Sequence, residues 1–142
     1  MVQYHLMFKE IEQETLIAVR EIIKEGLFKQ DKSVEDKKIL IQKLNDKLCN
    51  IYQLPIIPIL YEENCFGVGR YNSQQDIILL NKTSLVTFLH ECFHRKASIK
   101  KEENTEELAR GWSHSVYFKA TPILFANAVN KGLLIWQKSM EK

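Results

Sequence analysis

The sequence has few cysteines, prolines and glycines, and it lacks a long apolar run. Its 142 residues include three cysteines, an odd number without regular spacing, which argues against a disulfide framework and indicates a reducing compartment. The longest apolar stretch, residues 54–60, is too short to span a bilayer and is interrupted by proline. Residues 1–7 do not show the basic-then-apolar pattern of a signal peptide. We therefore expect a cytoplasmic protein without a membrane partner.

An excess of charge of one sign is also missing. Twenty Lys and Arg against eighteen Asp and Glu give a net charge of +2, and the pI is about 8.4. The lysines of the N-terminal half alternate with acids, whereas a nucleic-acid-binding domain normally has a higher pI and a basic stripe. Nucleic acid is therefore not an expected partner. The length and the 45% of hydrophobic residues predict one globular domain over residues 1–142.

The N-terminal third has helical periodicity. Apolar residues at three- and four-residue steps predict an amphipathic helix from about residue 7 to Phe28. Ser33 and Asp36 form a capping box, which predicts that a second helix begins there. The expected buried stripe of this second helix comprises Ile39, Leu40, Leu44, Leu48 and Ile51. Both helices are interpreted as scaffold.

A β pattern follows. The β-branched segment 56–61 predicts a strand, which Pro58 restricts to a sheet edge or a bulge. Segments 66–71 and 76–80 flank a polar turn and predict a β-hairpin. The Gly-x-Gly pair that ends at Gly69 indicates a bulge or close packing, because the helix start of a phosphate-binding loop does not follow it.

Three helices are predicted after the hairpin. The first has its N-cap candidates within residues 81–84 and runs to about Ala97. The second begins near Thr105, with acids in its first turn. The third has Pro122 at its first position and stops before Gly132. The expected fold class is α+β, with N-terminal helices, a small antiparallel sheet or hairpin, and then these three helices.

The first of these three helices carries the sequence His90-Glu91-x-x-His94, the H-E-x-x-H pattern of zinc hydrolases. Residues four positions apart lie on the same face of a helix, so the two imidazoles can bind one metal ion from adjacent turns. Glu91 lies about 100° around the helix from His90 and can reach a metal-bound water instead of the metal. This geometry suits a general base and predicts Zn²⁺ as the cofactor.

A catalytic zinc ion takes three protein ligands and leaves one position for water. The candidates for the third ligand are Glu102, Glu103, Glu106, Glu107, His114 and Cys65. On the helix that begins near Thr105, the predicted core side carries Trp112 and Val116, and Glu106 borders the adjoining flank of small residues. Glu107 and His114 point nearly away from that side. Glu106 is therefore favoured, and His114, Glu107 and Cys65 remain alternatives.

The order of strand, H-E-x-x-H helix and next helix with Glu106-x-x-Ala109 resembles the zincin metallopeptidases whose third ligand is a glutamate. The run that includes Gly69-Arg70-Tyr71, the polar turn and the H-E-x-x-H segment is similar to the ImmA/IrrE-like regulatory peptidases of bacteria and their mobile elements, over roughly residues 67–122. This resemblance implies hydrolysis of a peptide bond in an intracellular protein. It also implies that Glu91 is the general base and that His90, His94 and Glu106 hold zinc.

Two features differ from that family. Eleven residues separate His94 from Glu106, which is short for it, and Phe93 occupies a position where a small residue is usual. The spacing of His114 also resembles that of the SprT-like group, whose third ligand is a histidine.

Further expectations concern the surroundings of the motif. Strand 76–80 is expected to offer an edge to which an extended peptide substrate adds. Tyr117 is interpreted as a structural tyrosine, with hydrogen bonding to the oxyanion as the alternative. Cys92 is expected to be a small buried hydrophobe. Arg110 and His114 are interpreted as a solvated face. The competing function is a catalytically inactive zincin-like interaction module of a regulatory system or mobile element, and the oligomeric state stays open.

Overall fold

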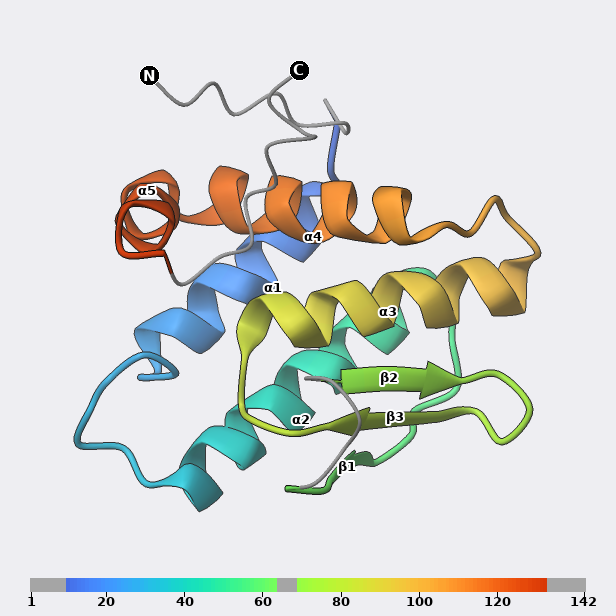
Figure 1. Cartoon of the computed structure of the whole chain (residues 1–142), viewed down its shortest axis with the longest axis horizontal. Helices are drawn as coiled ribbons and strands as arrows, with labels where there is room; N and C mark the ends of the chain where they lie inside the picture. Colours follow the sequence, from blue (N-terminus) through green and yellow to red (C-terminus); the bar gives the residue numbers. More distant parts are fainter. Residues whose placement is uncertain (1–9, 64–68, 133–142) are drawn as a thin grey trace.

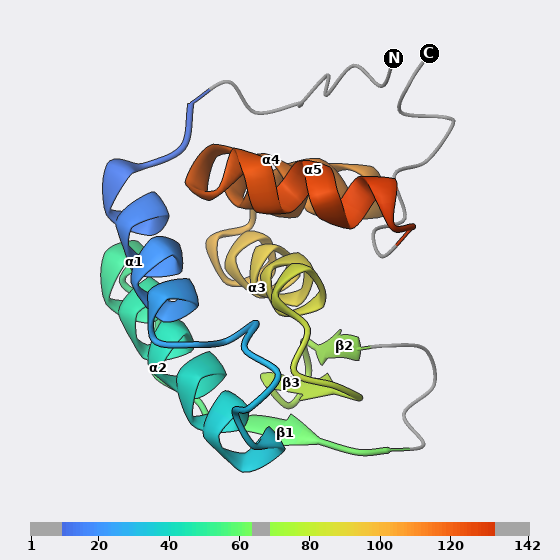
Figure 2. The same ribbon diagram turned by 90° about the vertical axis from the view of Figure 1, so that its left-hand side faces the viewer.

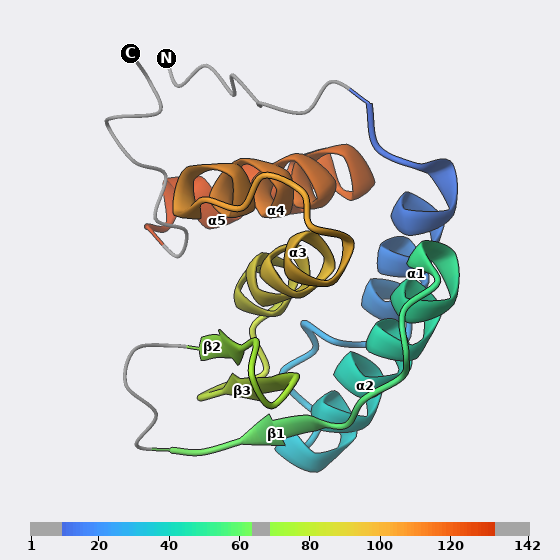
Figure 3. The ribbon, with the colours of Figure 1, turned by 90° about the vertical axis from the view of Figure 1, so that its right-hand side faces the viewer.

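The computed structural model describes residues 10–63 and 69–132 and has an α+β fold, as the sequence predicts (Figure 1). Its elements are α1 (Gln13–Lys24), α2 (Val34–Tyr52), β1 (Ile59–Tyr61), β2 (Gly69–Asn72), β3 (Ile77–Leu80), α3 (Leu85–Lys100), α4 (Glu106–Ala120) and α5 (Pro122–Asn130). Helix α3 runs through the middle of the molecule. The sheet lies on one side of it, α4 and α5 on the opposite side, and α1 with α2 along a flank (Figure 2, Figure 3).

The first helix is shorter than predicted. Residues 10–12 are not helical, and residues 7–9 lie outside the described part of the chain. At the other end, Gly26 has φ +112°, a conformation that side-chain-bearing residues rarely adopt, so α1 stops at Lys24 instead of Phe28. Arg20 of α1 donates hydrogen bonds from Nε and Nη2 to the carbonyls of Ala120 and Lys119 at 2.9 and 3.1 Å. These bonds satisfy the last carbonyls of α4 and place its C-terminus against α1.

The second helix begins as predicted, since the Ser33 hydroxyl accepts a hydrogen bond from the Asp36 amide at 3.0 Å. Its buried stripe agrees with the prediction at Leu40, Leu44 and Leu48, but Ile51 is only half-buried and Ile39 is exposed. Ile39 is 64% exposed, whereas Ile41 is fully buried. The helix therefore presents a face rotated from the predicted one, because α1 and the sheet cover adjoining parts of its surface.

The sheet is mixed and has the strand order β1-β3-β2. Strands β2 and β3 form the predicted antiparallel hairpin, with Gly69 opposite Leu80. Strand β1 adds to the other side of β3 in parallel, so the sheet is not purely antiparallel. The predicted edge role of residues 76–80 is therefore wrong, because β3 is central and β1 and β2 are the edges.

Side chains of α2 hold the segment that leads into β1. The amides of Gln42 and Asn45 each donate to the Ile57 carbonyl at 3.0 Å. The Ile59 amide donates to Gln42 Oε1 at 2.8 Å. Pro58, which lacks an N–H donor, lies directly before this edge strand, in agreement with its expected edge position.

The three C-terminal helices start where predicted, α5 with Pro122 as its first residue and α3 and α4 with side-chain caps. Ser84 accepts from the Thr87 amide at 3.3 Å, and Thr105 accepts from the Leu108 amide at 3.0 Å. Helix α3 extends to Lys100 instead of Ala97. In the part of the chain described, no helix combines the length and apolar character needed to cross a membrane.

Candidate metal centre

His90 and His94 lie on one face of α3 and point towards the start of α4. Their Nε2 atoms are 3.2 Å apart, and the side chains are 18% and 14% exposed. On the same helix, Leu85, Phe88, Leu89 and Phe93 are buried and fix α3 in the core. The two ring nitrogens that could bind a metal ion therefore meet on a helix whose position is set by packing.

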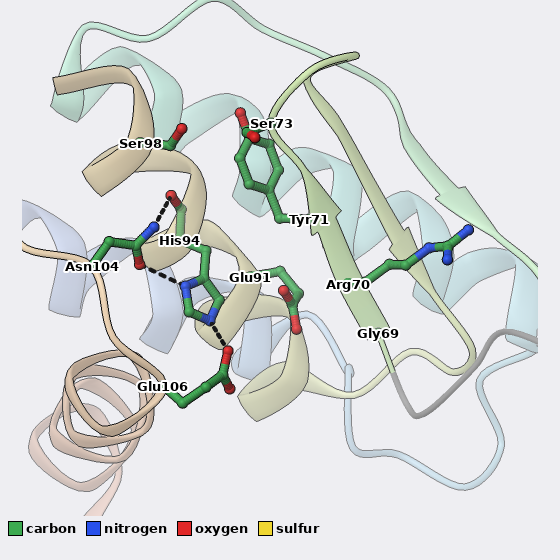
Figure 4. A pocket seen from close by; sticks show the side chains of 9 residues that line it. All are labelled: Gly69, Arg70, Tyr71, Ser73, Glu91, His94, Ser98, Asn104 and Glu106. Carbon is green, nitrogen blue, oxygen red and sulfur yellow. Dashed lines mark hydrogen bonds and ion pairs between the residues drawn. The ribbon is translucent and has the colours of Figure 1, made fainter. Parts of the chain in front are cut away.

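Glu106 is the first residue of α4 and reaches both imidazoles. Its Oε2 lies 2.9 Å from His90 Nε2, and its Oε1 lies 2.8 Å from His94 Nε2 (Figure 4 shows the His94 contact). Tetrahedral ligands at zinc distances are spaced roughly 3.3 Å apart. The spacing of the three groups is close to this value, so only small side-chain movements separate them from a shared ion. The cluster could hold a metal ion, and its residues are of the types that zinc prefers.

Burial and mutual contacts set the protonation of the cluster. Burial lowers the pKa of His90 below its usual value, against the opposing effect of Glu106. Burial by itself would raise the pKa of Glu106, but the hydrogen bonds and charges of His90 and His94 lower it overall. A neutral imidazole and a carboxylate are the forms that bind metal ions.

Glu91 lies on the flank of α3 that adjoins His94 and faces β2 (Figure 4). It is 7% exposed, and burial raises its pKa to about 7, although His94 and a hydrogen bond from the Tyr71 backbone lower it. The carboxylate faces a cavity of about 330 Å³ between α3, β2 and the start of α4, which is lined by the residues labelled in Figure 4. Glu91, His94 and Glu106 border this same cavity.

The strand that borders the cavity packs tightly against α3. A Cβ atom at Gly69 would lie 2.8 Å from Thr87 Cγ2 and 3.3 Å from the Leu79 carbonyl oxygen. The sequence left a bulge or close packing as the reason for Gly69, and the structure shows close packing. Among the described strands, β2 pairs with β3 on one side only, and its Tyr71 backbone N–H donates to Glu91 beside the cavity.

An ion pair that the sequence did not reveal joins the hairpin to α3. The Arg95 side chain is 2% exposed, and its Nε and Nη2 donate to the Asp76 carboxylate at 2.8 and 3.1 Å. The Tyr71 hydroxyl also donates to Asp76, at 2.8 Å. Arg95 follows Glu91 by four residues, so both lie on the same face of α3. That face therefore carries Glu91 and also the arginine that holds the β2–β3 hairpin through Asp76.

Asn104 is a second residue of the centre that sequence reasoning missed. Its Oδ1 lies 2.7 Å from His94 Nδ1. It is an uncharged residue in the connection between α3 and α4, and its only sequence signal is its position two residues before Glu106.

The alternative third ligands lie elsewhere. His114 is 3% exposed and packs against Phe125 of α5, with ring centroids 5.9 Å apart. The expectation of a solvated His114 is wrong, because α5 covers that side of α4. Glu107 is exposed and is not part of the cluster. Cys65 lies outside the described residues.

Tyr117 and Cys92 both pack against the hydrophobic core and lie outside the cluster. Tyr117 is buried and contacts the rings of Phe28 and Phe125 at centroid distances of 5.9 and 5.4 Å, as expected for a structural tyrosine. Cys92 is half-buried and packs against the core, and burial raises the pKa of its thiol.

Comparisons with models of known protein families, with curated proteins and with solved structures find no match. The likeness to zincins therefore depends on the residues of the motif and on the geometry of the cluster. That geometry is consistent with an H-E-x-x-H site.

Proposed function

We propose that the protein is a zinc-dependent peptidase that hydrolyses a peptide bond in an intracellular protein. The observation that carries the proposal is that two imidazoles and one carboxylate converge, with His90, His94 and Glu106 offering ligand atoms within 4.8 Å of one another. Glu91 adds a buried carboxylate that borders the same cavity as His94 and Glu106. Three ligands and an adjacent carboxylate are the parts that metal-assisted hydrolysis requires.

Each residue has a role in this proposal. His90, His94 and Glu106 hold the ion, and bound zinc supplies the Lewis acidity that activates water and polarises the substrate carbonyl. Glu91 accepts a proton from the attacking water and passes it to the leaving amine. Burial of Glu91 against β2 keeps its carboxylate directed at the cavity instead of into bulk solvent.

The substrate that fits this cavity is an extended peptide. The outer edge of β2 runs along the cavity, and its backbone N–H and C=O groups there, apart from the Tyr71 N–H that donates to Glu91, can pair with another strand. The peptide would then lie across the face of α3 that carries Glu91. This role belongs to β2 and not to residues 76–80, because β3 is central in the sheet.

The test combines metal analysis with one isosteric substitution. The purified protein is expected to bind about one zinc ion per chain and to cleave an unfolded general substrate such as casein. Glu91→Gln should retain the zinc and lower cleavage by roughly 10²–10⁴-fold. Glu103→Gln, an exposed carboxylate on the connection between α3 and α4, is the matched control and should cleave as the wild type does.

Equal cleavage by Glu91→Gln and the wild type would contradict the proposed mechanism. A protein that binds no zinc and whose partner binding is unchanged by His90→Ala would favour the inactive interaction module.

A further inference from the structure

Asn104 contacts one residue of the centre through both ends of its amide. Its Oδ1 lies 2.7 Å from His94 Nδ1, and its Nδ2 donates to the His94 backbone carbonyl at 3.5 Å. Figure 4 shows both contacts, with the ring of His94 between Asn104 on one side and Glu106 on the other. Asn104 therefore holds the ring at Nδ1, while Nε2 faces His90 and Glu106.

The direction of the amide determines the proton on His94. The Oδ1 atom can only accept a hydrogen bond, so His94 Nδ1 must carry a hydrogen. A reversed amide would set the Asn104 side-chain oxygen against the His94 backbone carbonyl, with two acceptors facing each other, so the contact with that carbonyl fixes the amide direction. With Nδ1 protonated, the lone pair of the neutral ring belongs to Nε2, the atom that faces His90 and Glu106, and a metal ion would take the place of any hydrogen that Nε2 shares with the Glu106 carboxylate.

We propose that Asn104 is a positioning residue that fixes the tautomer and the ring direction of His94 for metal binding. This inference depends on the proposed zinc site and adds a residue that is not itself a ligand. Asn104 and Glu106 lie two residues apart at the start of α4, so one short segment supplies both a ligand and the support of another ligand.

The expected size of the effect follows from the exposure of the contact. Loss of a partner that orients a metal-binding histidine typically weakens metal binding by 10–100-fold. Asn104 is exposed, so water can replace part of the lost hydrogen bond. We therefore expect a loss of about tenfold, at the lower end of that range.

The experiment compares two replacements of nearly the same size. Asn104→Asp keeps an acceptor at the position of Oδ1, and Asn104→Leu removes it. The zinc dissociation constant of each protein is measured by competition with a chromophoric chelator. Asn104→Leu should bind zinc about tenfold more weakly than the wild type, and Asn104→Asp should bind within about threefold of it. Glu103→Leu, at the exposed neighbouring position, should bind as the wild type does.

A second pair of variants separates the two neighbours of His94. In a Glu106→Ala background, Asn104→Leu should still weaken zinc binding several-fold, because Asn104 orients the His94 ring directly and not through Glu106. If the effect of Asn104→Leu disappears in that background, Asn104 acts by placing Glu106, and the assignment to His94 is wrong.

The outcomes distinguish this inference from the proposed function. Equal zinc affinity of Asn104→Leu and the wild type overturns the positioning role and leaves the zinc site in place. Equally weak binding by Asn104→Asp and Asn104→Leu also overturns it, because an acceptor would then be irrelevant. A wild-type protein that does not bind zinc overturns the zinc site itself, and the positioning role with it.

Discussion

Asp76→Asn isolates the charge of the ion pair that joins the hairpin to α3. Asp76 has φ +54°, a conformation that asparagine tolerates as well as aspartate does, so the backbone should not be strained. The substitution also keeps an oxygen that can accept the hydrogen bond from Tyr71. What it removes is the carboxylate that faces the Arg95 guanidinium through two contacts of 2.8 and 3.1 Å.

The expected loss follows from the burial of the two partners. Breaking a fully buried ion pair costs about 3–5 kcal/mol, because a charge is left without its partner. The Arg95 side chain is 2% exposed, but that of Asp76 is 35% exposed, so water can compensate in part. We expect Asp76→Asn to lower the free energy of unfolding by about 2–3 kcal/mol and the melting temperature by roughly 5–10 °C.

Urea denaturation of the metal-free protein measures this loss. Glu102→Gln is the matched control, because it removes the exposed partner of Lys96, a pair with a 2.9 Å contact and side chains 20% and 49% exposed. Surface pairs of this kind contribute about 0–1 kcal/mol. If both substitutions change the free energy of unfolding equally, the reasoning about the buried guanidinium is refuted.

Three further predictions concern pH, packing and metal. Burial lowers the pKa of His114 to about 4, so the unfolded chain binds more protons below about pH 6.5, and stability should fall as the pH falls from there. Urea denaturation at about pH 7 and about pH 4.5 measures how much the free energy of unfolding falls between the two pH values. We expect this fall to be about 2–3 kcal/mol larger in the wild type than in His114→Gln, and equal falls would contradict the burial of a neutral imidazole. Gly69→Ala should cost roughly 1–3 kcal/mol, because its new Cβ meets Thr87 Cγ2 at 2.8 Å, and adding Thr87→Ser should recover part of this. Zinc at roughly a hundred times its dissociation constant should stabilise the wild type by about 2.7 kcal/mol in thermal denaturation, and far less in His90→Ala.

Much of the centre follows from local spacing and capping chemistry. The positions of His90 and His94 on one helical face depend only on a four-residue step, and the structure places their Nε2 atoms 3.2 Å apart. Ser84 and Thr105 cap α3 and α4 as their sequence context predicts. These features are determined within a few residues, so neighbouring elements have little influence on them.

The sheet and the surroundings of α4 depend on distant contacts. The parallel addition of β1 to β3 depends on side chains of α2, which lie more than ten residues earlier in the chain. His114 is buried because α5 covers α4, whereas a helical projection of α4 alone places it away from the core. Helical geometry within one segment cannot indicate which second helix will cover a given face.

The sequence by itself determined the helix that carries the two imidazoles, the starts of the helices that follow, and the α+β class. Only the tertiary structure decided that Glu106 reaches both imidazoles, that Asn104 holds the ring of His94 and that β2 borders the cavity. The physical reason is that local structure depends on backbone hydrogen bonds over three or four residues. The meeting of α3, α4 and β2 depends on which apolar faces are buried together across the whole chain.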